Sequence, residues 1–218
     1  MRNLLTSVFI CIFSLSVYGE GIDLHSHAFM KHGTGILFRG DFNSPVKSKN
    51  YKSLLKSNLN HDTLIESDLN VLVVALYAHP ILTMFKGGPK NAIRKQIQEA
   101  RNFVKHHNDW IIAKTPKEAK DALKSGKRVL ILSLEGAENV LETEDDLDEF
   151  IDELGISIVT PIHLHDTHFG GAAYMRGFRK TLVGLSKLVT PLRSEGVRIN
   201  FKGMTYKGRK LLKELIKR

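Results

Sequence analysis

The stretch Asn70–Tyr77, NVLVVALY, is an unbroken apolar run rich in valine and leucine. A strand with one solvated face would place polar residues at alternate positions, and this run has none inside it. It therefore predicts a strand buried on both faces, as in a parallel sheet covered by helices. The run Arg128–Leu134, RVLILSL, predicts a second strand of the same kind.

Helical patterns alternate with these strands. Residues 91–107 place apolar side chains at helical spacing, and Thr115–Glu118, TPKE, is a capping box that opens a helix ending at Gly126. Further strands are predicted at Ile22–His25, Ile156–Ile162 and Gly196–Phe201, and further helices at 143–155, 182–194 and 205–218. The alternation predicts an α/β fold, either a doubly wound sheet or a (β/α)8 TIM-barrel-like fold. With about five β/α units in 218 residues, such a barrel is incomplete.

The first nineteen residues have the pattern of a signal peptide. Arg2 is followed by the apolar run Leu4–Val17, and cleavage is predicted after Gly19. An uncleaved anchor is the alternative, although the run is short for a bilayer span. We therefore expect a signal peptide over 1–19, one partial barrel domain over 20–218, and an exported protein, periplasmic or secreted.

Composition excludes several kinds of chemistry. Cys11 is the only cysteine and lies within the predicted signal, so the mature chain has no disulfide and no thiolate nucleophile or metal ligand. Without Arg2, 31 basic and 23 acidic residues remain, a net charge of about +8. The basic residues are scattered and lack interleaved aromatic residues, so no nucleic-acid partner is expected.

Histidines gather where the predicted strands end. Six of the ten follow a strand closely, namely His25, His27, His79, His163, His165 and His168. Chemistry in both candidate architectures lies at the carboxyl ends of strands. Residues two apart in an extended segment share a face, so His25 and His27 can bind one ion, and imidazole favours zinc or a similar metal.

Glu135 and His163 extend this candidate site. A carboxylate that follows a buried strand is costly to desolvate without a cation nearby, so Glu135 could bridge two metals that hold a hydroxide. His163 would then polarise a carbonyl or stabilise an oxyanion. Taken singly, the His-x-His pair is a weak pattern and Glu135 could be an ordinary loop residue. Their joint placement at strand ends favours metal binding.

Other polar residues have simpler interpretations. His79 before Pro80 is typical of a structural turn, and His106 and His107 at a helix end suit the helix dipole without a further function. The loop residues His165, Asp166 and His168 could be merely solvated.

In this order and spacing, the motifs resemble the renal (membrane) dipeptidase family of zinc peptidases, within the amidohydrolase-type barrels. They are Ile22–His27 (IDLHSH), Leu132–Ala137 (LSLEGA), Phe150–His163 (FIDELGISIVTPIH) and the run from Thr181 into Val197–Phe201. The resemblance implies that His25 and His27 bind one zinc, that Glu135 bridges two, and that His163 contacts substrate. The implied reaction is dipeptide hydrolysis by metal-bound hydroxide, with tolerance of a D-residue at the second position.

The sequence departs from the family late in the chain. The family has a zinc-binding histidine after its fifth strand, and Gly203 occupies that place here. A sixth-strand histidine ligand and the closing strands would lie beyond Arg218. The chain could thus be an inactive relative, bind one metal with help from His165 or Asp166, or belong to a longer product.

Three functions therefore compete. The first is a zinc dipeptidase-type hydrolase, and the second is a non-catalytic exported protein that binds a peptide or protein partner. The third, a barrel phosphoesterase, requires late histidine ligands and a phosphate-binding loop, for which Gly170-Gly171 is a weak candidate. An open barrel edge would also favour self-association.

Overall fold

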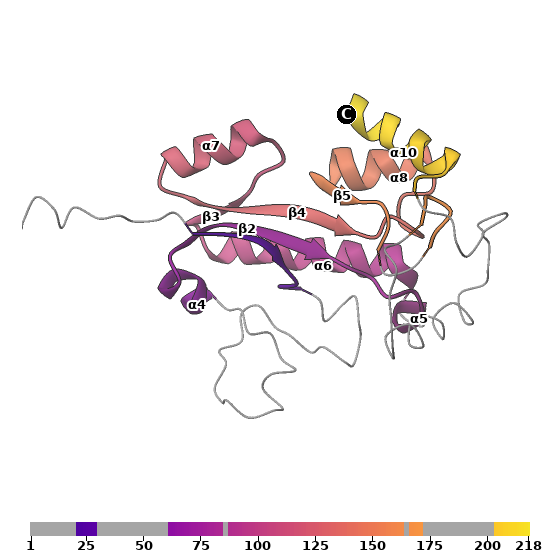
Figure 1. Ribbon diagram of the computed structural model, residues 1–218. Helices are drawn as coiled ribbons and strands as arrows, with labels where there is room; N and C mark the ends of the chain where they lie inside the picture. Colours follow the sequence, from indigo (N-terminus) through magenta and orange to yellow (C-terminus); the bar gives the residue numbers. More distant parts are fainter. Residues whose placement is uncertain (1–20, 30–60, 85–86, 164–165, 172–202) are drawn as a thin grey trace, which may run out of the picture.

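The computed structural model describes residues 21–29, 61–84, 87–163, 166–171 and 203–218. A parallel sheet lies at the centre of this part of the chain (Figure 1). Its strands are β1 (Gly21–Ser26), β2 (Leu69–Leu76), β3 (Trp110–Ile112), β4 (Arg128–Glu135) and β5 (Ile158–Thr160).

The strand order distinguishes the two candidate architectures. β1 pairs with β2, and β2 pairs with β4 in unbroken register from Val71 opposite Val129 to Leu76 opposite Leu134. The other edge of β4 is shared, because β3 pairs with residues 128–130 and β5 pairs with residues 133–135. The four strands predicted from sequence in this region therefore lie side by side in chain order, β1-β2-β4-β5.

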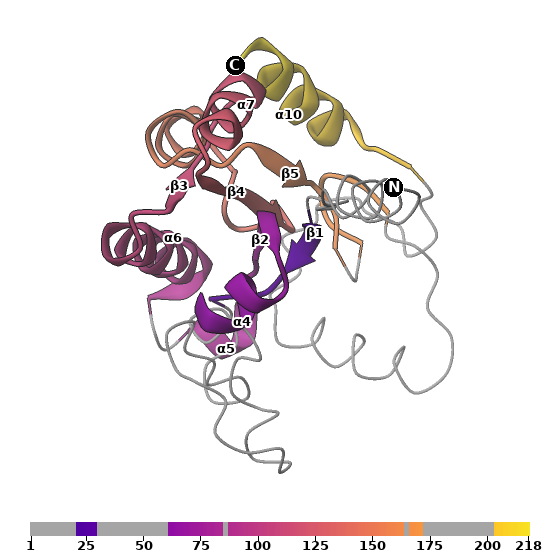
Figure 2. The ribbon, with the colours of Figure 1, turned by 90° about the vertical axis from the view of Figure 1, so that its left-hand side faces the viewer.

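A doubly wound sheet would reverse its strand order at a switch point, whereas a barrel keeps chain order. Figure 2, viewed along the strands, shows them following an arc with α6 (Gly88–His106) and α7 (Pro116–Lys124) on its outer side. The predicted incomplete barrel is confirmed. The predicted helix at 182–194, the strand at 196–201 and the signal peptide lie outside the described residues.

The other helices of the described residues are short, apart from the last. They are α4 (His61–Glu66), α5 (Pro80–Met84), α8 (Glu144–Leu147), its π-helical continuation η1 (Asp148–Glu153), and α10 (Tyr206–Lys217). Among these residues, no helix has the length and hydrophobicity needed to cross a bilayer.

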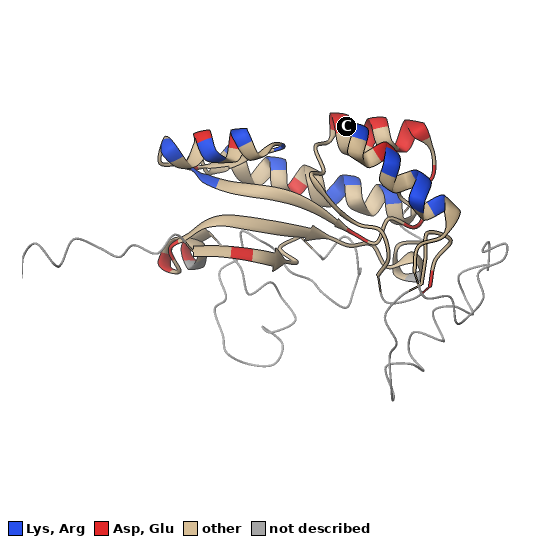
Figure 3. Cartoon of the chain, turned by 45° about the horizontal axis from the view of Figure 1, so that its top comes forward, with Lys and Arg blue, Asp and Glu red and all other residues tan. Residues whose placement is uncertain are grey.

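The sheet and its helices share one main core. Leu72, Leu130, Leu132 and Leu134 are fully buried in the strands, and α6 contributes side chains such as Ile97. Burying a leucine contributes about 1.5–3 kcal/mol, so these strands are held mainly by apolar contact. Charged residues gather instead on the helices, as Figure 3 shows, and the strands between them are mostly uncharged.

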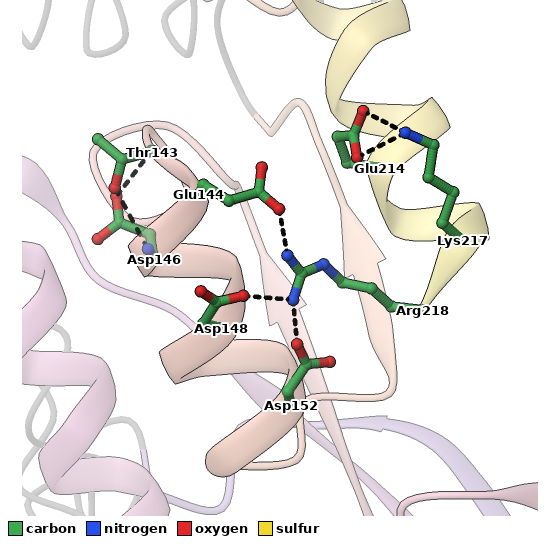
Figure 4. A network of polar contacts seen from close by, with 8 residues as sticks. All are labelled: Thr143, Glu144, Asp146, Asp148, Asp152, Glu214, Lys217 and Arg218. Atoms are coloured by element: carbon green, nitrogen blue, oxygen red, sulfur yellow. Dashed lines mark hydrogen bonds and ion pairs between the residues drawn. The ribbon is translucent and has the colours of Figure 1, made fainter.

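Threonine caps begin the helices where sequence patterns predicted them. Oγ1 of Thr115 accepts a hydrogen bond from the backbone of Glu118 at 3.1 Å, although the Glu118 carboxylate bonds the backbone of Lys114 rather than that of Thr115. Thr143 and Asp146 form a complete capping box, shown in Figure 4. Caps of this kind stabilise a helix by about 1 kcal/mol.

The last helix docks against the acidic segment formed by α8 and η1. The guanidinium of Arg218 bonds Asp148 at 2.8 Å and also contacts Glu144 and Asp152 (Figure 4). At its other end α10 packs closely against the loop after β5. The approach is so close that a Cβ on Gly208 would stand 2.0 Å from the carbonyl oxygen of Phe169. Both ends of α10 are thus fixed by residues far away in sequence.

Candidate metal centre

The histidine pair lies where β1 ends. His25 belongs to the strand and His27 follows it, and their Nε2 atoms are 3.2 Å apart. The two rings meet edge to face, with planes at 87°. The backbone N–H of His25 donates to the carboxylate of Asp23 at 2.9 Å, which helps to fix the end of the strand.

Glu135, the last residue of β4, reaches the same point from across β2. Its Oε1 lies 3.6 Å from Nε2 of His25, and its Oε2 lies 3.2 Å from Nε2 of His27. Donors about 2.1 Å from one tetrahedral zinc stand about 3.4 Å from each other. The three measured separations lie close to this value, so the group fits a single metal ion.

One oxygen of the Glu135 carboxylate lacks a hydrogen-bond donor, although the side chain is largely buried. The side chain is 12% exposed, and Oε2 accepts no hydrogen bond from any described residue. A buried carboxylate oxygen without a donor is costly unless a cation neutralises it. This is a structural reason, independent of sequence motifs, to place a positive ion between Glu135 and the histidine pair.

The protonation states suit a metal. Burial opposes ionisation of Glu135, but His163, His27 and His25 outweigh that effect and hold its pKa below the usual value. Burial lowers the pKa of His27, assisted by the neighbouring histidines and opposed by Glu135. At neutral pH the group therefore offers a carboxylate and a neutral imidazole, the forms that bind metal.

His163 approaches Glu135 from beyond β5. Its Nε2 is 2.9 Å from Oε1 of Glu135. Gly136 makes this approach possible, because it adopts φ 89° immediately after Glu135 and donates its N–H to the carbonyl of Thr160 at 2.9 Å. A φ of this sign favours glycine, which gives the Glu-Gly motif a physical reason.

Tyr77 is a site residue that sequence reasoning missed. It follows β2, and its ring meets the ring of His163 edge to face at 5.1 Å. Burial and the charge of Glu135 raise the pKa of Tyr77 to about 12, so the phenol stays protonated. The buried Gln96 holds its backbone, donating to the Tyr77 carbonyl at 2.9 Å. An aromatic residue at a strand's carboxyl end was the available signal.

The remaining candidates lie apart from this group. Nδ1 of His79 accepts from the Leu82 backbone at 3.4 Å at the start of α5, which agrees with the turn interpretation. His168 lies beside Glu142, with its Nε2 at 3.0 Å from that carboxylate. Asp166 is described but does not join the metal-ligating group, and His165 lies outside the described residues.

A parallel barrel segment with two histidines and a glutamate converging at its carboxyl edge is the arrangement of a barrel-type metallohydrolase. A sequence model of the membrane dipeptidase family, peptidase family M19, matches residues 18–197. The chain belongs to this family, and the predicted resemblance is confirmed. None of the curated protein sequences matches the chain.

Solved structures agree with this fold. A dipeptidase described as a metallopeptidase of family M19 aligns at TM-score 0.60 and 16% identity, over 89% of this chain and 53% of that one. A Rhodobacter sphaeroides metallopeptidase, solved with a phosphinate mimic of the dipeptide L-Ala-D-Ala, aligns at TM-score 0.59 and 16% identity, over 89% and 55%. The probable dipeptidase PvdM of Pseudomonas aeruginosa aligns at TM-score 0.55 and 12% identity, over 86% and 46%.

At these identities the likeness concerns the fold alone. The chain spans about half the length of the solved proteins, with 53% and 55% of the first two covered.

Proposed function

We propose that this chain binds zinc through His25, His27 and Glu135 and is built to hydrolyse dipeptides. The observation that carries the proposal is the convergence of these three side chains, from two strands that are not neighbours, at the separations one metal ion needs. Family membership supports the dipeptide as substrate, since one relative of similar fold was solved with a dipeptide mimic.

Each side chain has a distinct task in this proposal. His25 and His27 would hold the ion through their Nε2 atoms, and Glu135, whose Oε1 lies near His25 and whose Oε2 lies near His27, would add a charged oxygen. When bound, the ion supplies Lewis-acid activation of water and of the peptide carbonyl. His163 presents Nε2 beside the same carboxylate, where it can hydrogen-bond the substrate carbonyl as negative charge develops. Tyr77 packs against His163 and fixes the direction of its ring.

A non-catalytic role is the second candidate, and Gly203 favours it. This residue stands where the resemblance implies a zinc-binding histidine, and glycine offers no side-chain ligand. Its backbone has φ 115°, a conformation that histidine rarely adopts, although no described atom lies within 4 Å of the place a Cβ would occupy. A chain with one metal position could retain peptide binding without turnover.

Self-association and export complete the proposal. Along β1, which ends the described sheet, Ile22 and Leu24 are 56% and 74% exposed. Apolar side chains on an unpaired edge strand favour contact with another chain. The signal-peptide pattern of residues 1–19 supports a periplasmic or secreted location.

The test compares Glu135→Gln with a matched control in the following loop, Glu138→Gln. Zinc content per chain is measured after loading and dialysis, and hydrolysis of L-Ala-D-Ala is then assayed. We expect the first variant to retain one ion fewer than the parent and the control to match the parent. Equal zinc in all three proteins would refute the site.

Hydrolysis decides between the two candidate functions. If zinc binding depends on Glu135 and the parent protein also hydrolyses the dipeptide, the peptidase function is supported. The same zinc without turnover, but with saturable binding of a phosphinate dipeptide mimic, supports the non-catalytic alternative.

A further inference from the structure

A second group of metal-ligating side chains lies at the opposite end of the sheet. His61 begins α4, His107 caps the end of α6, and Asp109 directly precedes β3. Figure 1 shows α4 and the end of α6 beside the starts of the strands, away from the carboxyl ends that carry His25, His27 and Glu135. From its sequence pattern, His107 suits a helix end without a further function, and no motif predicts a role for His61.

The contacts of Arg128 show that Asp109 lies at the amino ends of the strands. Arg128 is the first residue of β4, and its guanidinium bonds the Asp109 carboxylate at 3.1 Å and the carbonyl of Leu69, the first residue of β2, at 3.1 Å. Its backbone N–H also donates to the Asp109 carbonyl at 2.7 Å. Asp109 is therefore held at the amino edge of the sheet by the strand that carries Glu135 at its other end.

The donor atoms are close enough to share an ion. One ligand atom from each of His61, His107 and Asp109 lies within 4.8 Å of the other two. Nε2 of His61 is 3.4 Å from Oδ2 of Asp109, the separation expected for two ligands of a tetrahedral zinc, about 3.4 Å. Two imidazoles and one carboxylate form a donor set that suits zinc and similar transition metals.

We propose that His61, His107 and Asp109 form a second site, which binds a divalent transition metal of the zinc class. Nothing in this proposal depends on dipeptide hydrolysis or on Glu135. The role of the bound ion is structural, because its three ligands join the start of α4, the end of α6 and the start of β3. A ligand that binds only the folded chain stabilises it.

The present arrangement of the rings defines what must move. The rings of His61 and His107 stack with centroids 3.9 Å apart and planes at 15°, and the ring of Phe103 packs beside them. An ion lies near the plane of each imidazole that binds it, and nearly parallel planes do not share such a point. Metal binding therefore requires one of the two rings to turn out of the stack.

Charge near the group is compatible with a cation. Arg128 donates one hydrogen bond to Oδ2 of Asp109, and a carboxylate oxygen keeps a further lone pair through which it can bind an ion. Asp62 lies next to His61, with Oδ1 at 3.9 Å from Nδ1, and its side chain is 84% exposed. The two carboxylates of Asp62 and Asp109 outweigh the single charge of Arg128, which favours a cation at this place.

The experiment uses the full chain with Glu135→Gln, so that the first site does not obscure the second. Zinc and cobalt are titrated into this metal-free protein, and binding is followed by calorimetry and by the visible absorption of tetrahedral cobalt. We expect one ion per chain. Adding His107→Gln should weaken binding roughly tenfold or more, whereas the matched neighbour His106→Gln should leave it unchanged. His106 is outside the group, with Nδ1 at 2.7 Å from the Asn102 carbonyl.

The melting temperature is a second measurement, which separates loss of metal binding from misfolding of a variant. Zinc should raise the melting temperature of the Glu135→Gln protein and of its His106→Gln derivative, and should not raise that of a His61→Gln derivative with unchanged circular dichroism. Absence of binding in the Glu135→Gln protein would overturn the proposal. Equal binding by the His106→Gln and His107→Gln derivatives would overturn it too.

Discussion

Nε2 of His163 lies 2.9 Å from Oε1 of Glu135, although Glu135 ends β4 and His163 follows β5. β4 and β5 are paired up to Glu135 opposite Thr160, so the end of the sheet sets this distance. His163 contacts Glu135 in this way but does not belong to the metal-ligating group, so it can act on substrate while the metal stays in place.

We predict that His163→Ala separates turnover from metal binding. If the chain hydrolyses dipeptides, kcat should fall by about 10²–10³-fold, because a hydrogen bond to the developing oxyanion is lost. Zinc content should stay at the parent value, measured beside His168→Ala as a control for a nearby histidine outside the group. Loss of zinc in His163→Ala would show that His163 is a ligand instead.

Leu132→Ala should be among the most destabilising substitutions in the sheet. Leu132 is fully buried in β4, and removing its side chain leaves a cavity, so unfolding free energy should fall by about 2–5 kcal/mol. Urea denaturation measures the change. Leu212→Ala on α10, where the side chain is 41% exposed, should change stability far less. Equal losses would contradict the assignment of the core.

Gly208→Ala should loosen the start of α10. Alanine normally stabilises a helix relative to glycine by about 1 kcal/mol, but here its Cβ would meet the Phe169 carbonyl oxygen and the Met204 side chain. We expect a net loss of about 1–3 kcal/mol and faster hydrogen exchange across 206–217. Lys207→Ala, at an exposed neighbouring position, is the matched control. A more stable Gly208→Ala protein would refute the close approach.

Asp146 should make the fold sensitive to acid. Burial opposes its ionisation, but Lys90 and the backbone N–H groups of Glu142 and Thr143 outweigh this and hold its pKa below the usual value. A carboxyl whose pKa is lower in the folded state stabilises the fold above its unfolded pKa of about 4, and this contribution disappears as pH falls through the folded pKa.

The test is unfolding of the parent and of Asp146→Asn between pH 7 and pH 2. The gap in stability between the two proteins should be largest at neutral pH and should close below about pH 4. An exposed carboxyl on the same turn, Asp145→Asn, should show no comparable gap. A gap that does not vary with pH would mean that ionisation of Asp146 is not its cause.

The buried strands were predictable because each is a continuous apolar run bounded by polar residues. β3 was not, because Trp110–Ile112 is three residues long and its pairing with the first residues of β4 depends on the folded sheet. The short helix α4 was missed for the same reason, since it has too few turns for a periodic pattern. The helix predicted at 143–155 is present as α8 and η1, and only the π-helical form of η1 was not foreseen.

The candidate metal group was predictable in part. His25 and His27 are two residues apart, and the strand-end rule brings Glu135 to them. The proximity of His107 to His61 could not be foreseen, because 46 positions separate them and the end of α6 and the start of α4 meet only in three dimensions. Tyr77 was overlooked because its contact with His163 depends on the curvature of the sheet.

The divided edge of β4 has a consequence for how this chain can change over time. β3 braces residues 128–130 and β5 braces residues 133–135, so the two ends of one strand depend on different neighbours. Substitutions near β5 can therefore shift Glu135, while the pairing of β3 with β4, which holds Asp109, stays as it is. A lineage can therefore lose or remodel the chemistry at one end of the sheet while the other end stays intact.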